Sequence, residues 1–355
     1  MDSEKLGYQV GIEVTVPLEY DEKTPSKYPV IFIFDKQNER SYNYIRTTID
    51  YLTSNDQMPA SVVVGVTSGE GMSRYNETQL STSDSTAYGE KNEAFIFEEL
   101  LPHIRSNFQG GEHLTLIGHS RYGYFTSLLL TRNPERLGAV ISMSPFMEQK
   151  NVSLFDELQQ MTNTVKLDQP VYYRFDIGED YPDDYMKVDS LIVEDKLTSP
   201  YFDIRGKLFP AAEHTVTPGL FIGEALYDIF EFWADRQAVY LDNAVKEFSQ
   251  IEGLLSEIED HYGSALPFSL GVLNGKGWFF YGEGEYEKAI QAWEIMLAQY
   301  PNFSDGYFNI ATAKHEMGLD IQTELAQFKE SLKTSTFYSE EEKEGYLKEL
   351  EELDW

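Results

Sequence analysis

Cysteine is absent from the 355 residues of the sequence. Disulfide bonds, thiolate catalysis and sulfur-ligated metal sites are therefore excluded. No apolar run approaches the roughly eighteen residues that a membrane-spanning helix needs, so we expect no membrane span. The first residues, MDSEKLGYQVGIEV, lack the basic stretch and apolar core of a signal peptide. The compartment stays open between the cytoplasm and the periplasm or exterior, because a leader removed beforehand would leave no trace.

Basic residues are scarce. The chain has 28 Lys and Arg against 60 Asp and Glu, for a formal net charge of −32. Such a surface repels phosphate backbones and no basic stripe interrupts it, so we expect no nucleic-acid partner. The acidic excess is interpreted as a solvated surface rather than as a cation site.

The length and composition predict two domains. Hydrophobic residues make up 41% of a chain that is longer than one core usually serves. Short β-branched runs alternate with helical patterns in residues 1–237, which predicts an α/β domain with a mostly parallel sheet. Residues 238–355 show helices without strands, which predicts a small all-α module. Expected strands are Gln9–Pro17, Val30–Phe34, Ser61–Val66, Leu114–Gly118, Ala139–Met143, Val171–Ile177 and Phe202–Leu208; expected helices are Asn43–Thr53, Lys91–Phe108, Tyr122–Thr131, Asp184–Lys196 and Pro218–Asp235.

Residues 67–90 form a long polar stretch rich in Ser, Thr and Gly. A loop of this length inside a domain is often a wall or lid of a site, but a solvated excursion fits the composition equally well.

The C-terminal module has a repeat signature. Five residues between 273 and 302 fall where a tetratricopeptide repeat places its Gly, aromatic, Gly, Ala and Pro, and Gly318 follows Gly284 by 34 residues, the period of that repeat. A lone repeat cannot bury its own face, so we expect Asp242–His261 to add a further helical layer. The five positions are Gly277, Phe280, Gly284, Ala289 and Pro301.

The stretch LTLIGHSRYGYFTSLLL runs from an apolar strand through Gly118 and Ser120 into a helical pattern. This is the context of a nucleophile elbow, in which a sharp turn projects a serine toward an imidazole and toward backbone N–H groups. Tyr122 occupies the second glycine position of G-x-S-x-G, and the glycine follows at 123. We predict Ser120 as the nucleophile of an α/β-hydrolase fold.

The general base is predicted from chain order, since α/β-hydrolases place serine, acid and histidine in that sequence. His214 follows the last expected strand and precedes the last helix of the α/β domain, on a loop able to reach Ser120. The other five histidines precede or flank the serine or lie in the helical module: His103, His113, His119, His261 and His315.

The acid should follow the strand VYYRFDI, because its carboxylate must hold the imidazole in one tautomer. Asp180 is the first candidate and Glu179 the second; Asp183 stays open, and Asp176 is weakest because it lies within the strand.

The oxyanion hole needs two N–H donors. One is predicted at Arg121, directly after the nucleophile, and the other on the loop after VIFIFD, near Lys36 or Gln37.

Residues from about 8 to 235 resemble the Putative esterase family, which includes enterobactin-type siderophore esterases, esterase D with S-formylglutathione hydrolase, and feruloyl and acetylxylan esterases. The resemblance is nearest to the siderophore-esterase branch, and it implies an α/β-hydrolase with Ser120 and His214 as nucleophile and base. Two positions depart from the family pattern, Tyr122 and Lys36. The matching stretches are KYPVIFIFD, VVVGVTSGEGMSRYNET, FIFEELLPHIRSNF, LTLIGHSRYG, SMSPF and EHTVTPGLFIGEALYDIF.

Two residues are predicted on the substrate side of the site. Arg74, in SRYNET, matches a recurrent family arginine, for which contact with substrate, bracing of a loop and a structural ion pair stay open. Tyr122 is predicted as a second substrate-binding residue.

The predicted function is hydrolysis of carboxylic esters through an acyl-enzyme, without metal or organic cofactor. Expected substrates are small molecules: a siderophore-type lactone, a phenolic ester or a short acyl ester. The alternative is a degenerate hydrolase fold that acts as a binding scaffold through its helical module. That module would bind a protein partner, mediate self-association or cover one flank of the hydrolase; barely two repeats favour the last two roles.

Overall fold

The computed structural model describes residues 1–22, 27–81, 86–242, 244 and 247–352. Packing divides them into two units. The first comprises Met1–Val16, Lys27–Phe232 and Ile258–Leu266, and the second holds the other described residues. The domain boundary between residues 237 and 238 stays a prediction.

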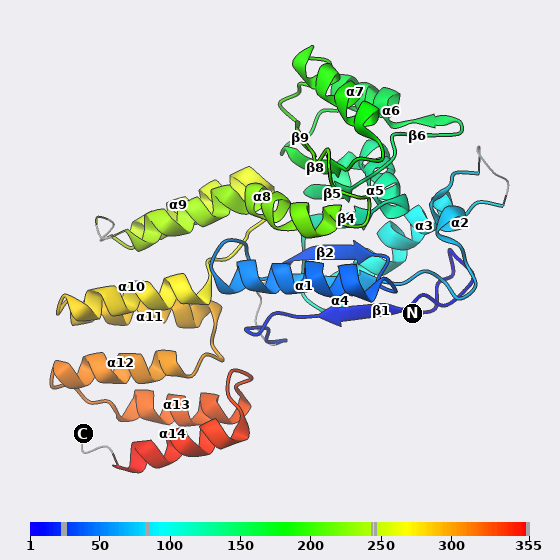
Figure 1. Cartoon of the computed structure of the whole chain (residues 1–355). Helices are drawn as coiled ribbons and strands as arrows, with labels where there is room; N and C mark the ends of the chain where they lie inside the picture. Colours follow the sequence, from blue (N-terminus) through cyan, green and yellow to red (C-terminus); the bar gives the residue numbers. More distant parts are fainter. Residues whose placement is uncertain (23–26, 82–85, 243, 245–246, 353–355) are drawn as a thin grey trace. The chain divides into compact units, whose positions relative to one another are not determined.

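The first unit is built on one seven-stranded sheet in the order β1-β3-β2-β4-β5-β8-β9 (Figure 1). β1 pairs antiparallel with β3 and every other pair is parallel, which confirms the mostly parallel α/β fold. β2, β3, β5 and β8 are buried along their whole length, as the continuous apolar runs VIFIF and SVVVGV predict for β2 and β3. The strands are β1 (Ile12–Thr15), β2 (Tyr28–Phe34), β3 (Val62–Val66), β4 (Gly110–His119), β5 (Ala139–Met143), β8 (Val171–Ile177) and β9 (Phe202–Leu208), with a separate hairpin of β6 (Glu148–Gln149) and β7 (Val152–Ser153).

Helices connect the parallel strands, as right-handed crossovers require. The predicted helix 91–108 is three consecutive segments, of which the middle one is a π-helix. The polar stretch 67–90 contains a short helix, and its residues 82–85 lie outside the described residues. No described helix is long and apolar enough to cross a bilayer. The segments are α1 (Glu39–Ser54), α2 (Arg74–Thr78), α3 (Gly89–Ala94), η1 (Phe95–Leu100), α4 (Leu101–Asn107), α5 (Arg121–Arg132), η2 (Pro134–Arg136), α6 (Leu154–Thr164), α7 (Pro182–Val193) and α8 (Thr217–Leu241).

The strand register brings the carboxyl ends of the parallel strands to one edge of the sheet. Phe34 is paired with Val66, and Met143 with both His119 and Asp176. The loops after β2, β3, β4, β5 and β8 therefore open at the same edge, where ligands bind in sheets of this kind.

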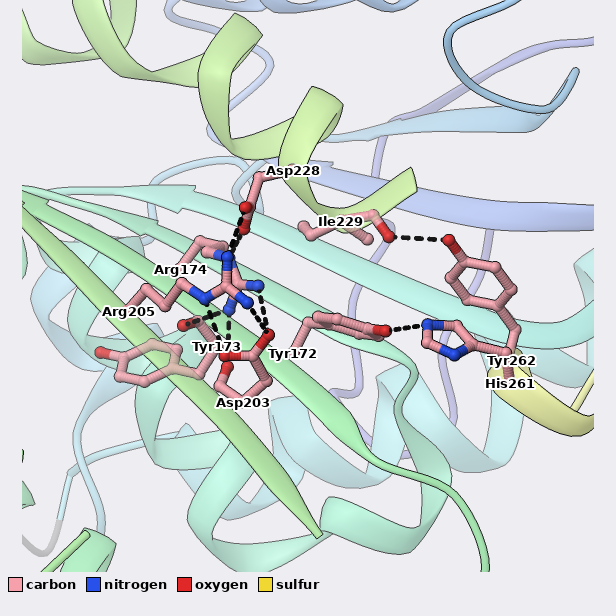
Figure 2. A network of polar contacts seen from close by, with 9 residues as sticks. All are labelled: Tyr172, Tyr173, Arg174, Asp203, Arg205, Asp228, Ile229, His261 and Tyr262. Atoms are coloured by element: carbon pink, nitrogen blue, oxygen red, sulfur yellow. Dashed lines mark hydrogen bonds and ion pairs between the residues drawn. The ribbon is translucent and has the colours of Figure 1, made fainter. Parts of the chain in front are cut away.

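A charged cluster fixes α8 on β8 and β9 (Figure 2). The buried guanidinium of Arg174 bonds to Asp203, 2.8 Å away, and to Asp228 on α8, and Arg205 contacts the same two carboxylates. Since α8 begins three residues after His214, the cluster also positions the loop that carries this histidine.

The last turn of α9 (Ser249–Tyr262) also packs within the first unit (Figure 2). The Tyr262 hydroxyl donates to the Ile229 carbonyl at 3.0 Å, and the His261 ring bonds to the Tyr172 hydroxyl. A segment that follows α8 in sequence is therefore part of the hydrolase core.

The second unit contains helices and no strand in its described residues, which confirms the all-α module. Gly284 and Gly318 both have positive φ, at 74° and 70°, directly after the first helix of each helix pair. A Cβ at Gly277 would lie 2.2 Å from Trp293, so α10 and α11 pack closely there. The tetratricopeptide assignment stays a prediction, and residues 243 and 245–246 of the expected extra layer lie outside the described residues. The helices are α10 (Leu270–Gly282), α11 (Tyr286–Gln299), α12 (Asp305–Glu316), α13 (Gln322–Thr334) and α14 (Glu340–Glu352).

Candidate active site

Ser120 occupies a strained turn between β4 and α5. Its backbone has φ 57° and ψ −116°, a conformation that a residue with a side chain rarely adopts. The Ser120 N–H donates to the Met143 carbonyl at 2.8 Å, which ties the turn to β5. A Cβ at Gly118 would lie 2.3 Å from the Tyr122 carbonyl oxygen, so only glycine fits there. This is the strand–turn–helix geometry of a nucleophile elbow.

His214 and Asp180 meet on the loops that follow β9 and β8. The Nδ1 atom of His214 bonds to the Asp180 carboxylate. Since a carboxylate accepts, Nδ1 carries the proton and Nε2 is left to accept one, which is the tautomer that a general base needs. Glu179, the second candidate, is exposed, and its backbone N–H donates to the Ala212 carbonyl.

His119 holds the His214 loop against the end of β4. Its Nε2 donates to the His214 carbonyl at 2.9 Å, and the two rings lie 4.8 Å apart. Burial lowers the pKa of His119 to about 4, which keeps the imidazole neutral at physiological pH. Sequence reasoning considered His119 only as a base and missed its positioning role; its place beside Ser120 was the available signal.

The hydroxyl of Ser120 makes no hydrogen bond to His214 in the part of the chain that the structure describes. The histidine instead contacts His119, the residue before the serine. The two groups thus lie at the same edge of the sheet with their bond unformed. Catalytic hydrogen bonds in hydrolases commonly tighten only when substrate binds.

The backbone N–H groups predicted as oxyanion donors differ in whether they already have an acceptor. Arg121 is the first residue of α5, where a backbone N–H has no intrahelical acceptor. Lys36 was predicted as the second donor, but its N–H donates to the Val66 carbonyl at 3.0 Å and is occupied. Its neighbour Gln37, the alternative, has an N–H without a backbone acceptor among the described residues.

Tyr122 does not face the substrate side of the site. Its side chain is 3% exposed, its ring stacks on Phe34 at 5.5 Å, and its hydroxyl donates to the Glu77 carboxylate at 2.8 Å. The prediction that Tyr122 binds substrate is corrected accordingly. The elbow tolerates a side chain here because the ring points beneath the loops that surround the site.

The Tyr122 hydroxyl also braces the loop after β2. It lies 2.7 Å from the Ser68 hydroxyl, which accepts from the side-chain amide of Gln37 at 2.8 Å. The Ser68 N–H returns a bond to Gln37 Oε1 at 3.2 Å. Glu77 accepts further bonds from the Gly69 N–H and Tyr8. A chain of hydrogen bonds therefore runs from Glu77 through Tyr122 to Gln37.

Arg74 braces the same loop from the other side. Its Nε donates to Asp35, 2.7 Å away, and Asp35 has a positive φ of 68° directly after β2. Burial raises the pKa of Asp35, and the ion pair with Arg74 opposes that shift. The ion pair fits both loop bracing and a structural role for Arg74, and contact with substrate stays a prediction.

The remaining carboxylates near His214 are placed otherwise. Asp176 is fully buried, accepts from the Ser144 N–H, and has its pKa raised to about 7 by burial. Asp183 is exposed at the start of α7. Asp180 is thus the carboxylate that the structure brings to the imidazole.

No group of three or more His, Asp or Glu side chains among the described residues could hold a metal ion. A cavity of about 420 Å³ lies at the opposite edge of the sheet, lined by Gly138 and Val171 from the amino ends of their strands. It is therefore separate from the candidate site.

Residues 3–178 match the family described as Putative esterase. This part of the chain belongs to the Putative esterase family. The match includes Ser120 and ends before Asp180 and His214, so it does not test those two residues. The match supports an ester hydrolase function for the chain. Among the curated proteins compared, none matches it in sequence.

Solved structures share the fold. A serine hydrolase described as IroE-like, from Shewanella oneidensis, superposes with a TM-score of 0.66 at 15% identity, covering 83% of this chain and 96% of its own. An uncharacterised protein from Capnocytophaga ochracea has a TM-score of 0.61 at 14% identity, covering 99% and 98%. The BES protein from Bacillus cereus has a TM-score of 0.52 at 21% identity, covering 64% and 92%. The similarity to the Capnocytophaga ochracea protein covers 99% of this chain and therefore includes its helical module.

Proposed function

We propose that this esterase cleaves carboxylic esters with Ser120 as nucleophile, His214 as general base and Asp180 as the acid that orients the base. One observation carries the proposal. Ser120 sits in a strained turn at the edge where Asp180 holds the Nδ1 of His214. Strain at a polar residue beside an oriented imidazole favours a reactive serine over an ordinary turn.

In the proposed reaction, His214 Nε2 takes the proton of the Ser120 hydroxyl as the oxygen attacks the ester carbonyl. The N–H groups of Arg121 and Gln37 stabilise the negative charge on the carbonyl oxygen. The protonated histidine then gives its proton to the leaving alcohol, and an acyl-serine remains. Water, deprotonated by the same histidine, attacks the acyl-serine and releases the acid.

The proposed substrates are siderophore-type lactones, phenolic esters or short acyl esters, as the sequence resemblance implies. The test is a panel of p-nitrophenyl acyl esters together with a siderophore trilactone and a feruloyl ester. Ser120→Ala and His214→Ala should each lower kcat on any substrate cleaved by at least about 10³-fold. Undiminished hydrolysis by Ser120→Ala would overturn the proposal.

A second candidate function is a binding scaffold with an inactive hydrolase fold. The unformed bond between Ser120 and His214 and the presence of the helical module favour it. Complete absence of hydrolysis across the panel, by a folded wild-type protein, would support the scaffold over the esterase mechanism.

A further inference from the structure

Arg121 carries an unpaired positive charge beside the proposed nucleophile. Its guanidinium carbon lies 4.4 Å from the centre of the Phe146 ring and 5.0 Å from that of Tyr75. One of its terminal nitrogens is buried and has no hydrogen-bond partner among the residues that the structure describes. Within the described chain this guanidinium makes no ion pair, although the sequence carries a net charge of −32.

The surroundings place this guanidinium at the candidate site. Arg121 directly follows Ser120, and the two rings that its guanidinium contacts lie on segments that follow β5 (Phe146) and β3 (Tyr75), at the carboxyl edge of the sheet. Tyr75 also receives a second cation on its ring, because Lys150 Nζ lies 5.1 Å from the ring centre. Two positive charges thus share one aromatic wall of the site.

Asp180, Asp35 and Glu148, three carboxylates of the loops at this edge, have partners other than Arg121. Asp180 bonds to His214 and Asp35 to Arg74, while Glu148 pairs with Lys187 at 3.1 Å. The charge of Arg121 is therefore not neutralised by the acidic side chains that face the site.

We infer that Arg121 binds a carboxylate carried by the ester substrate, so that the enzyme prefers carboxylate-bearing esters over neutral ones. This inference rests on the proposed function. A guanidinium presents a planar fork of N–H donors that matches the two oxygens of a carboxylate. Stacking on Phe146 and Tyr75 fixes the plane of the fork before the substrate arrives, which lowers the entropy lost on binding.

The test compares esters that differ only in the charge of one group. For the acyl side the pair is p-nitrophenyl hydrogen adipate and p-nitrophenyl 6-methylheptanoate; for the alcohol side it is 4-acetoxybenzoate and 4-isopropylphenyl acetate. Rates are corrected for the background of Ser120→Ala, and the measured quantity is the ratio of kcat/KM within each pair. In the wild type the carboxylate ester should be favoured by at least about tenfold in one pair.

Arg121→Gln should bring that ratio close to one, and Arg121→Lys should retain part of it because the charge remains while the fork is lost. Arg136→Gln is the matched control, since Arg136 also stacks on an aromatic ring, 4.7 Å from Phe97, but lines the cavity at the opposite edge. Its ratio should equal that of the wild type.

A wild-type ratio of one or less in both pairs would overturn the inference, as would a ratio unaffected by Arg121→Gln. Either result leaves ester hydrolysis by Ser120 standing. Hydrolysis no faster than the Ser120→Ala background for all four esters would instead contradict the proposed function, and this inference with it. Should Arg121→Gln fail to fold, the wild-type and Arg121→Lys ratios still decide.

Discussion

At the scale of single residues, the loops around Ser120 are held by side chains that cannot contact substrate. The clearest case is Tyr122, which occupies the second glycine position of the G-x-S-x-G motif and yet connects Glu77 to Gln37 through Ser68. A residue that looks like a disruption of the motif is a support of the loop that carries a proposed oxyanion donor.

Tyr122→Phe should lower kcat by about tenfold, less than the loss of a whole oxyanion donor costs, because the loop around Gln37 loses its brace. It should also lower the free energy of unfolding by about 1–3 kcal/mol, since Glu77 loses a buried donor. Kinetics and urea unfolding measure the two effects. Tyr124→Phe is the matched control, because the hydroxyl of this buried neighbour has no hydrogen-bond partner in the described parts of the chain. Equal behaviour of the two variants would refute the bracing role.

The choice of acid is also tested at this scale. Asp180→Asn should lower kcat by about 10²–10⁴-fold, because an amide no longer stabilises the imidazolium or fixes its tautomer. Glu179→Gln should change kcat little, since the Glu179 side chain is exposed and its loop contact is made by the backbone. The reverse order of the two effects would assign the acid to Glu179.

Among the secondary-structure elements, β4 carries a histidine toward each end. Burial lowers the pKa of both His113 and His119 to about 4. An unfolded histidine takes up a proton below about pH 6.5, whereas these two resist it until about pH 4. Their neutral state therefore supports the fold fully above pH 6.5, and this support is lost as the pH falls toward 4. Asp176 acts in the opposite direction, because its raised pKa penalises the fold as the pH rises from about 4 to 7.

Replacing His113 isolates one of these contributions. Wild-type unfolding free energy should lose about 2 kcal/mol through His113 alone between pH 7.5 and pH 5. His113→Phe keeps an aromatic ring against Phe230 and Tyr262 but removes the titrating group. In the variant, the unfolding free energy measured with urea should fall less between pH 7.5 and pH 5, by about 2 kcal/mol. An unchanged difference between the two pH values would show that His113 is not the group responsible.

Elements with a strong local pattern could be predicted from the sequence, and those shaped by distant contacts could not. The bounds of β5, β8 and β9 agree with the predicted strands, because each is a short β-branched or aromatic run ended by turn residues. Ser120 could likewise be predicted from the strand and helix around it. The sequence could not show that the Lys36 N–H is already occupied, because its acceptor is the carbonyl of Val66 on the neighbouring strand β3.

On the scale of the whole molecule, the fold of the first unit is completed by residues that follow α8. Tyr262 is 5% exposed, its hydroxyl reaches Ile229, and its ring contacts Phe230. No local pattern in the sequence predicts that the end of α9 packs in the first unit, since α9 has the composition of the helical module.

Tyr262→Ala should therefore destabilise the protein by about 3–5 kcal/mol, the cost of removing a large buried aromatic side chain. Tyr51→Ala, at a tyrosine that is 67% exposed, should change the unfolding free energy by no more than about 0.5 kcal/mol. Chemical denaturation of the full-length chain measures both. A small effect of Tyr262→Ala would mean that the end of α9 is dispensable for the hydrolase.

The central claim is that Ser120 is an activated nucleophile, and a fluorophosphonate probe tests it without knowledge of the substrate. The probe reacts with a serine whose hydroxyl is deprotonated by an adjacent base. Mass spectrometry of the labelled wild type should find one modification, on Ser120; Ser120→Ala should take up none, and His214→Ala should react far more slowly. A wild-type protein that stays unlabelled, or that is labelled at another residue, would contradict the account.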